Sequence, residues 1–194
     1  MKKDKSTNSK HSVFLAHSKV IIVKRVSSRL DKAIREGLCQ CFPEDKKIFS
    51  KTRAWHGTLP TWSVIIECEG RIIAHVGVVD RVIKLASRKI RVAGIQNVFV
   101  VHDYRGQGLL KRIMDAAMKE AELLCFDCGL LFCIPELAEI YKKYGWIILP
   151  TSSIIRINEK GQEVPIPGKN ITMYYPLLCK KISQTTIHLQ GNDW

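Results

Sequence analysis

The stretch from Val98 to Ala121, VFVVHDYRGQGLLKRIMDAAMKEA, joins an apolar run to a loop with two glycines and then to an amphipathic segment. Apolar side chains recur every three or four positions in that segment, which predicts a helix over Leu109–Leu124 with one face packed on a sheet. The next apolar run, Asp127–Ile134, predicts a strand. Because this strand, helix and strand are long enough for a parallel crossover, the sheet is expected to contain parallel pairing.

Three β-type runs follow one another closely before the helix. They predict strands over Trp62–Cys68, Arg71–Lys84 and Lys89–Val101. The connections between them are only Glu69-Gly70 and Ala86–Arg88. Short connections of this kind join antiparallel strands, so this part of the chain is expected to form an antiparallel meander.

Further elements are expected on both sides of this core. A strand is predicted over Lys19–Arg25 and a helix over Ser28–Cys41, with Ser28 as its N-cap. The later elements are a helix over Glu136–Tyr144 and strands near Trp146–Leu149, Ile154–Asn158 and Ile171–Leu177. The sequence therefore predicts an α/β (α+β) fold, with a mixed, mostly antiparallel central sheet flanked by helices.

The size and charge of the chain limit its organisation and partners. With 194 residues it is long enough for one well-buried core, so we expect a single domain over residues 19–194. Residues 1–18 are rich in lysine and poor in apolar side chains, which predicts a flexible basic tail. The chain has 31 Lys and Arg against 18 Asp and Glu, a net charge of +13. A field of this sign attracts acidic or phosphorylated partners and repels polycations.

Neither a membrane location nor a bound metal is expected. The apolar runs are shorter than the roughly 18 residues that cross a bilayer, and His17 to Lys19 interrupt the stretch where a signal peptide would need continuous hydrophobicity. The seven cysteines are an odd number, mostly within apolar runs, which is typical of reduced cytoplasmic proteins. Cys125 and Cys128 form a C-x-x-C without a second pair at ligand spacing, so packing is favoured over a metal site. We predict a cytoplasmic protein.

The loop Arg105–Gly108 places free backbone N–H groups at the start of the predicted helix. Such a position binds anions, and glycine lets a phosphate approach without a Cβ in its way. The loop lacks the Lys followed by Ser or Thr of a nucleotide P-loop, and Lys111 stands where a dinucleotide fingerprint needs a third glycine. The alternative is that Gly106 and Gly108 only form a tight turn between strand and helix.

Two motifs resemble the GCN5-related N-acetyltransferase (GNAT) superfamily. Its acetyl-CoA signature Q/R-x-x-G-x-G/A is matched from Arg105 to Leu109 and departed from at Leu110, and the second signature, Y-x-x-x-G-W, fits Tyr141–Trp146. The resemblance implies an acetyltransferase fold with acetyl-CoA as co-substrate. The residues that it places at the cofactor are Val98, Val100, Arg105, Gly106, Gln107, Gly108, Leu109 and Leu110.

Two groups within that superfamily are similar in further segments. The block RAWHGTLPTWSVIIECEGRIIAHVGVVDRVIKL is similar to rhizobial nodulation N-acyltransferases, which transfer a fatty acyl group from acyl carrier protein to an amino sugar. GRIIAHVGVV and the ending QGNDW are similar to aminoglycoside 2'-N-acetyltransferases. Since both acylate a sugar amine, the resemblance implies a primary amine acceptor of amino-sugar or aminoglycoside type. This chain departs by having Gln96 where the aminoglycoside enzymes carry Glu.

The resemblance suggests roles for four residues. Tyr141 is the candidate acid that protonates the departing thiolate, and the alternative is a core aromatic that pairs with Tyr144. Gln96 cannot accept a proton, but it could align a water or the amine. Asp193 and Trp194 are expected to bind the acceptor. No strong general base is evident in the sequence.

Two other functions stay open at this point. One is the same transfer with acyl carrier protein as donor, which the basic charge favours because carrier proteins are acidic. The other is a non-catalytic nucleic-acid-binding or regulatory module, suggested by charge alone. Nucleic acid is not the expected partner, since the sequence lacks the interleaved aromatic and basic residues of single-strand binders. The sequence leaves open whether the protein forms a homodimer.

Overall fold

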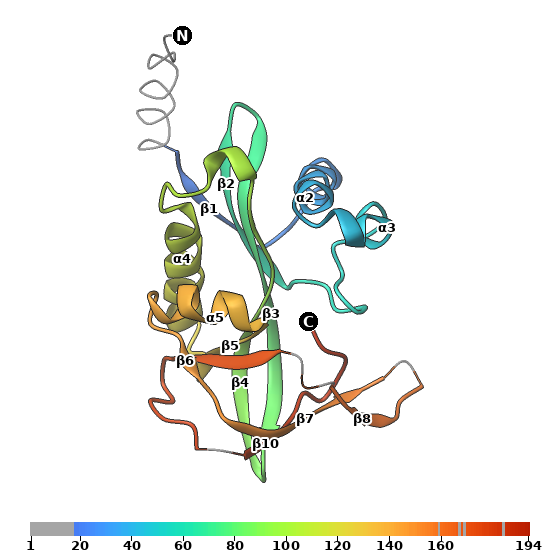
Figure 1. Cartoon of the computed structure of the whole chain (residues 1–194), viewed down its shortest axis with the longest axis vertical. Coiled ribbons are helices and arrows are strands. Elements are labelled where there is room, and N and C mark those ends of the chain that lie inside the picture. Colours follow the sequence, from blue (N-terminus) through green and yellow to red (C-terminus); the bar gives the residue numbers. More distant parts are fainter. Residues whose placement is uncertain (1–17, 159, 167, 169, 184) are drawn as a thin grey trace.

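The computed structural model describes residues 18–158, 160–166, 168, 170–183 and 185–194 (Figure 1). The predicted basic tail lies outside the described residues, except for Ser18. The helical elements are α2 (Ser28–Cys41), η1 (Pro43–Asp45), α3 (Lys46–Phe49), η2 (His102–Tyr104), α4 (Leu109–Leu123) and α5 (Pro135–Lys142). The strands are β1 (Val20–Val23), β2 (Trp62–Cys68), β3 (Arg71–Leu85), β4 (Arg88–Val100), β5 (Cys128–Cys133), β6 (Ile147–Ile148), β7 (Thr151–Ile157), β8 (Glu163–Pro165), β9 (Ile171–Pro176) and β10 (Thr185–His188).

These strands form one mixed sheet around the long β3. Strand β3 pairs antiparallel with β4, with β2 near its start and with β10 near its end. The predicted crossover is confirmed, because β4 and β5 run parallel from Val92↔Cys128 to Ile95↔Leu131 and α4 connects them. Apart from β4–β5 and β10–β7, the pairs are antiparallel. The mixed, mostly antiparallel sheet and the single domain are therefore as predicted.

Helices cover both faces of the sheet. Helices α4 and α5 share one hydrophobic cluster with β2, β3 and β4, and α2 packs in a second cluster with the same strands. Alternate residues of β2 follow this division, since Val64 and Ile66 belong to the first cluster and Ile65 to the second. Figure 1 shows α4 and α5 on one side of the long β3–β4 hairpin and α2 and α3 on the other.

The start of α2 corrects one expectation. The helix begins at Ser28, but the N-cap is Ser27, whose side chain accepts a hydrogen bond from the Leu30 amide at 3.3 Å. Ser27 has an extended backbone, as a cap requires, whereas Ser28 is already helical. Two adjacent serines carry the same capping signal, so the sequence could not separate them.

Strands β4 and β5 separate beyond their last partner pair. Five residues of β4, from Gln96 to Val100, continue past Ile95 without a partner on β5. A β-bulge lies in this part of β4, because the register with β3 shifts between His75 and Gly77 and Asn97 adopts a left-handed backbone with φ of 55°. A gap therefore opens within the sheet at this point.

None of the helices in the described ranges has the length and hydrophobicity that a bilayer-spanning segment requires.

Candidate active site

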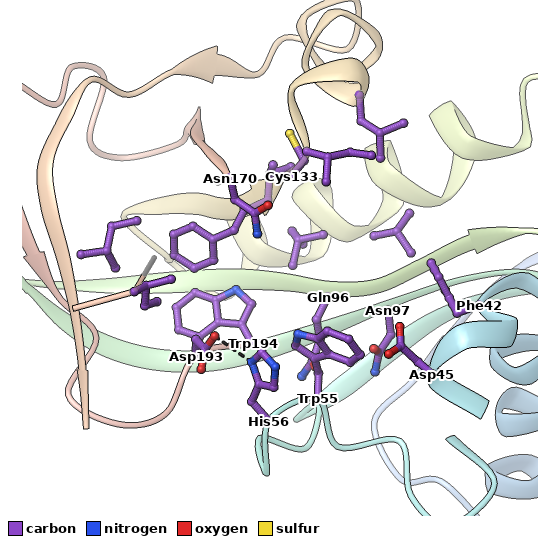
Figure 2. Close-up of a pocket in the computed structure, with 18 of the residues that line it drawn as sticks. Phe42, Asp45, Trp55, His56, Gln96, Asn97, Cys133, Asn170, Asp193 and Trp194 are labelled. Atoms are coloured by element: carbon purple, nitrogen blue, oxygen red, sulfur yellow. Dashed lines mark hydrogen bonds and ion pairs between the residues drawn. The ribbon is translucent and has the colours of Figure 1, made fainter. Parts of the chain in front are cut away.

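A cavity of about 780 Å³ lies where β4 and β5 separate. One wall is formed by Ile95–Val98 of β4 and another by Leu131–Ile134 at the end of β5. Segments distant in sequence complete it, including η1, α3, the turn before β2, α5, β7 and the last residues of the chain. Figure 2 shows side chains from these segments around one hollow, and Figure 1 shows how the last segment returns to the middle of the long strands.

The β4 bulge is fixed by a buried hydrogen-bond chain. The backbone oxygen of Asn97 accepts from His75 Nδ1 at 2.7 Å, and the Asn97 side chain donates to the Arg53 carbonyl at 2.7 Å. His75 Nε2 lies 3.1 Å from Ser63 Oγ. His75 has no exposed surface, and burial lowers its pKa to about 4, so the imidazole is neutral at pH 7. His75 is thus a partnered core residue.

Gln96 lies in the cavity wall with half of its amide satisfied. Its Nε2 donates to the Thr58 carbonyl at 3.1 Å, and its side chain is buried. Its Oε1 has no hydrogen-bond partner among the described residues. A buried acceptor without a partner costs about 1–3 kcal/mol, so this oxygen fits a ligand that brings an N–H donor.

Tyr141 reaches the same cavity from α5. It is buried, and its ring meets Trp146 edge-on at 6.3 Å between centroids. Burial raises its pKa above the ordinary value for tyrosine, so the phenol carries its proton at pH 7. The side chain therefore packs against Trp146 and lines the cavity as a protonated phenol.

Asp193 and Trp194 both line the cavity. Burial opposes ionisation of Asp193, but the hydrogen bond and charge of His56 and the charge of Arg156 hold its pKa below the ordinary value. Asp193 Oδ2 lies 2.7 Å from His56 Nδ1, and Oδ1 lies 2.8 Å from Arg156 Nη1. The carboxylate is therefore ionised and already has two partners. A ligand ammonium group at Asp193 would compete with both.

Trp194 depends on a glycine in the middle of β4. A Cβ at Gly94 would stand 2.3 Å from the Trp194 ring, so only glycine leaves room for the indole against the strand. The indole also lies 5.6 Å from the Phe132 ring and 5.1 Å from the Arg81 guanidinium carbon. Its Nε1 has no hydrogen-bond partner in the described part of the chain.

The glycine loop has the geometry of an anion site. Gly106 and Gly108 have φ of 75° and 74°, and the space where a Cβ would stand is open at both. The first intrahelical bond of α4 joins the Arg112 amide to the Gly108 carbonyl at 3.2 Å, so the amides of Leu109 and Leu110 have no intrahelical acceptor. The loop therefore offers backbone donors beside open space.

The side chains around the loop show where Leu110, the departure from the acetyl-CoA signature, is accommodated. Leu110 packs against the core cluster that also contains Leu109 and Tyr141, so it does not crowd the loop. Arg105 Nε donates to the Val100 carbonyl at 3.1 Å, and Gln107 donates to the Asp103 carbonyl at 3.4 Å. Val98 lines the cavity, whereas the Val100 carbonyl accepts the hydrogen bond that ties Arg105 of the loop to β4.

His56 and Arg156 are functional candidates that the sequence did not single out. His56 lies within an irregular segment, AWHGT, and Arg156 lies on β7. Arg156 belongs to no motif, and His56 lies in the block that is similar to the nodulation N-acyltransferases but was given no role there. The one local signal was the His-Gly pair, which marks a turn and not a chemistry.

Within the described ranges, no three His, Cys, Asp or Glu side chains are grouped so that they could hold a metal ion. All seven cysteines are free thiols; Cys125 is exposed and Cys128 is buried.

Comparison with known families assigns the chain to a family. The sequence model of the family described as "Acetyltransferase (GNAT) domain" matches residues 24–149, well over half of the chain. The chain therefore belongs to the GNAT acetyltransferase family.

Individual relatives are more distant. The chain is 28% identical over 121 residues to an aminoglycoside 2'-N-acetyltransferase of Mycolicibacterium fortuitum, and the match spans 62% of each protein. Among solved structures, the GNAT family N-acetyltransferase YhbS of Escherichia coli in complex with CoA has a TM-score of 0.64, with 14% identity and 89% of each chain covered. Escherichia coli ElaA has a TM-score of 0.59, with 14% identity, 81% of this chain and 99% of its own covered. At these identities the two structures show a shared fold.

Proposed function

We propose that this protein is an acetyl-CoA-dependent N-acetyltransferase whose acceptor is a primary amine on a small molecule of amino-sugar or aminoglycoside type. One observation carries the proposal. Tyr141 and the part of β4 beyond its β5 pairing line one cavity together with Gln96 and Asp193, and the glycine loop follows β4 and contacts the hydrophobic cluster of Tyr141 through Leu109 and Leu110. Membership of the family and the distant aminoglycoside acetyltransferase relative support it.

The donor binds, in this proposal, along the backbone from β4 to α4. Acetyl-CoA supplies the thioester whose acetyl group is transferred. The amides from Gly106 to Leu110 hold its pyrophosphate, because they lie at a helix start and face open space. Val98 and Val100, beyond the β4–β5 pairing, hold the pantetheine arm, and Arg105 keeps the loop against Val100. Gln107 is exposed at the edge of this site.

The acceptor amine lies, in this proposal, between Gln96 and Tyr141. The unsatisfied Gln96 Oε1 accepts a hydrogen bond from the amine and orients it. The protonated Tyr141 phenol donates its proton to the departing sulfur. Because burial raises its pKa, the phenol holds its proton until charge develops on the leaving group.

The charge of the cavity supports a cationic acceptor in spite of the basic surface. The chain carries +13 overall, which would repel a polycation at long range. Glu44, Asp45 and Asp193 nevertheless line one cavity, drawn from two segments far apart in the sequence. An ammonium group inside the cavity therefore meets a local charge opposite in sign to that of the whole protein.

The test is release of free thiol from acetyl-CoA with a panel of amines. The panel contains an amino sugar, an aminoglycoside and a simple alkylamine, and each product is identified by mass. We expect acetylation of at least one sugar amine well above the rate of thioester hydrolysis. Absence of amine-dependent thiol release, together with absence of acetyl-CoA binding by calorimetry, would reject the proposal.

A carrier-protein donor is the second candidate, and the net charge of +13 favours it. In that case acyl carrier protein supports turnover, and binding weakens steeply as salt rises from low to physiological strength. Equal turnover at both salt concentrations, or turnover with acetyl-CoA alone, would count against that donor. Cytoplasmic location and the oligomeric state stay predictions.

A further inference from the structure

His56 projects into the cavity beside the proposed acceptor position, and no step described so far uses it. It belongs to the turn between α3 and β2 and lines the cavity together with Gln96 and Asp193. Figure 2 shows its ring next to Trp55 and directed toward Asp193. The centroids of the His56 and Trp55 rings are 4.7 Å apart. His56 Nδ1 lies 2.7 Å from Asp193 Oδ2.

The contact with Asp193 defines the free nitrogen of the ring. An ionised carboxylate can only accept hydrogen bonds, so the Nδ1 of neutral His56 carries the proton and Nε2 carries the lone pair. In the described part of the chain, Nε2 has no hydrogen-bond partner. The side chain is 42% exposed, so Nε2 can reach both a ligand and solvent.

The turn that presents His56 is strained and held from several sides. His56 has a left-handed backbone with φ of 43°, an arrangement that costs about 1 kcal/mol or more for a residue with a side chain. The Thr58 amide donates to the Trp55 carbonyl at 2.8 Å, and the Asn192 side chain donates to the His56 carbonyl. Arg81 of β3 bonds both Thr58 and Asn192. The position of the imidazole is therefore fixed by the fold.

Charged side chains from several elements surround His56. Asp193 is in direct contact, and Arg156 of β7 contacts the opposite oxygen of Asp193 at 2.8 Å. Arg81 of β3 acts on Asp193 at longer range. Across the cavity, Glu44 and Asp45 add negative charge. A carboxylate behind a histidine orients the ring and stabilises the imidazolium that forms.

We infer that His56 is the general base of the transfer and that Asp193 is its positioning residue, an inference that rests on the proposed acetyltransferase function. Nε2 accepts a proton from the acceptor ammonium group and later releases it to solvent. The neutral amine nitrogen of the acceptor then attacks the thioester carbonyl, so that a C–N bond forms and the C–S bond breaks. The thiolate gains a proton from Tyr141, and the second proton lost by the nitrogen returns to the Tyr141 phenolate. The products are the N-acetylated amine, the free thiol and one proton in solvent.

A purely structural role makes a different prediction. If the contacts of His56, Asp193 and Arg156 only tie the last segment of the chain to the turn, then loss of His56 lowers stability. Loss of His56 would then also raise the KM for the acceptor, but it would not change how the rate depends on pH. If His56 is the base, its loss lowers kcat and changes the pH profile, because the rate then follows the fraction of acceptor that is already deprotonated in solution.

The test compares His56→Asn with His188→Asn. Asn tolerates a left-handed backbone, and its amide nitrogen can replace Nδ1 as donor to Asp193 while it removes Nε2. His188 forms a similar pair with Glu163 at 3.6 Å but does not line the cavity. We expect kcat/KM at pH 7 to fall roughly 10²-fold to 10³-fold in His56→Asn, within the range for one general base. We expect it to stay at the parental value in His188→Asn.

The pH profile and a chemical rescue separate the two roles. The rate of His56→Asn should rise with pH where the parent levels off, with acetyl-CoA affinity unchanged. His56→Gly fits the positive φ even better, and added imidazole should restore part of its rate but leave His188→Asn unaffected. A folded His56→Asn protein with the parental rate and pH profile overturns the inference, as does failure of imidazole to stimulate His56→Gly. An inactive parent with every amine instead rejects the proposed function, and this inference with it.

Discussion

The two halves of the proposed active site are built in different ways. The donor half, Val98 to Leu110, is one continuous stretch that leaves β4, turns and enters α4. The acceptor half, His56, Gln96, Asp193 and Trp194, comes from three segments up to 138 positions apart in the sequence. The donor half offers backbone groups, whereas the acceptor half offers side chains that other side chains hold in place. A local backbone site can be recognised from its own sequence, whereas the long-range contacts that assemble a side-chain site cannot.

The largest effect is expected at Tyr141, where the two halves meet. Tyr141→Phe keeps the ring packed on Trp146 and removes only the proton donor. We expect kcat to fall roughly 10²-fold to 10⁴-fold, with a smaller change in KM and an unchanged affinity for acetyl-CoA. Steady-state kinetics and calorimetry measure both quantities. Tyr144→Phe is the control, and parental kcat in Tyr141→Phe would leave Tyr141 with a packing role only.

The donor half is tested by a carboxylate placed in the glycine loop. In Gly108→Asp the new charge faces the proposed pyrophosphate, and like charges about 4 Å apart at a protein surface repel by up to about 4 kcal/mol, which solvent reduces. We expect acetyl-CoA to bind roughly 10²-fold more weakly while acceptor binding is unchanged. The measurement is the Kd for acetyl-CoA by calorimetry.

Gly161→Asp supplies the matched control for this change. Gly161 has φ of 75° and equally open space around its Cβ position, but it lies in the turn between β7 and β8. Backbone strain is therefore the same in both variants, and only Gly108 lies in the glycine loop. Equal acetyl-CoA affinity in folded Gly108→Asp and in the parent would remove the phosphate site from the loop.

The comparison of the halves also explains what the sequence could predict. The meander, the crossover and α4 follow from local periodicity, because each buries a continuous apolar face. Strand β10, Thr185–His188, was not predicted, since four residues with no alternation become a strand only between β3 and β7. For the same reason the sequence did not identify His56, because its importance comes from contact with Asp193, 137 positions away.

The acceptor half is tested through the space that holds Trp194. Gly94→Ala puts a Cβ 2.3 Å from the indole, and Gly37→Ala puts one 2.4 Å from Phe99, outside the cavity. Both changes overpack the core and should lower the free energy of unfolding by about 1–3 kcal/mol. Only Gly94→Ala displaces a ring that lines the cavity, so only it should raise the acceptor KM, by roughly tenfold, a loss of about 1.4 kcal/mol in binding. Equal acceptor KM in the two variants would exclude Trp194 from the acceptor half.

The smallest effect on turnover is expected at His75, which supports Gln96 and Val98 through the bulge but faces no ligand. Its pKa is about 4 in the folded protein because it is buried, against roughly 6.5 in the unfolded chain. As pH falls below 6.5 the unfolded state therefore takes up a proton that the folded state refuses. The stability present above pH 6.5 is then lost progressively down to pH 4, at up to about 1.4 kcal/mol per pH unit.

Urea unfolding of the parent and of His75→Gln between pH 7.5 and 5 isolates this contribution. Gln cannot titrate, so the difference in unfolding free energy between the two proteins should shrink as pH falls, even if the variant is less stable throughout. A constant difference between parent and His75→Gln would mean that His75 takes up its proton in the folded protein as readily as in the unfolded chain. The bulge would then carry a charge beside the cavity, and the contrast between a neutral His75 in the core and a proton-accepting His56 at the acceptor would fail.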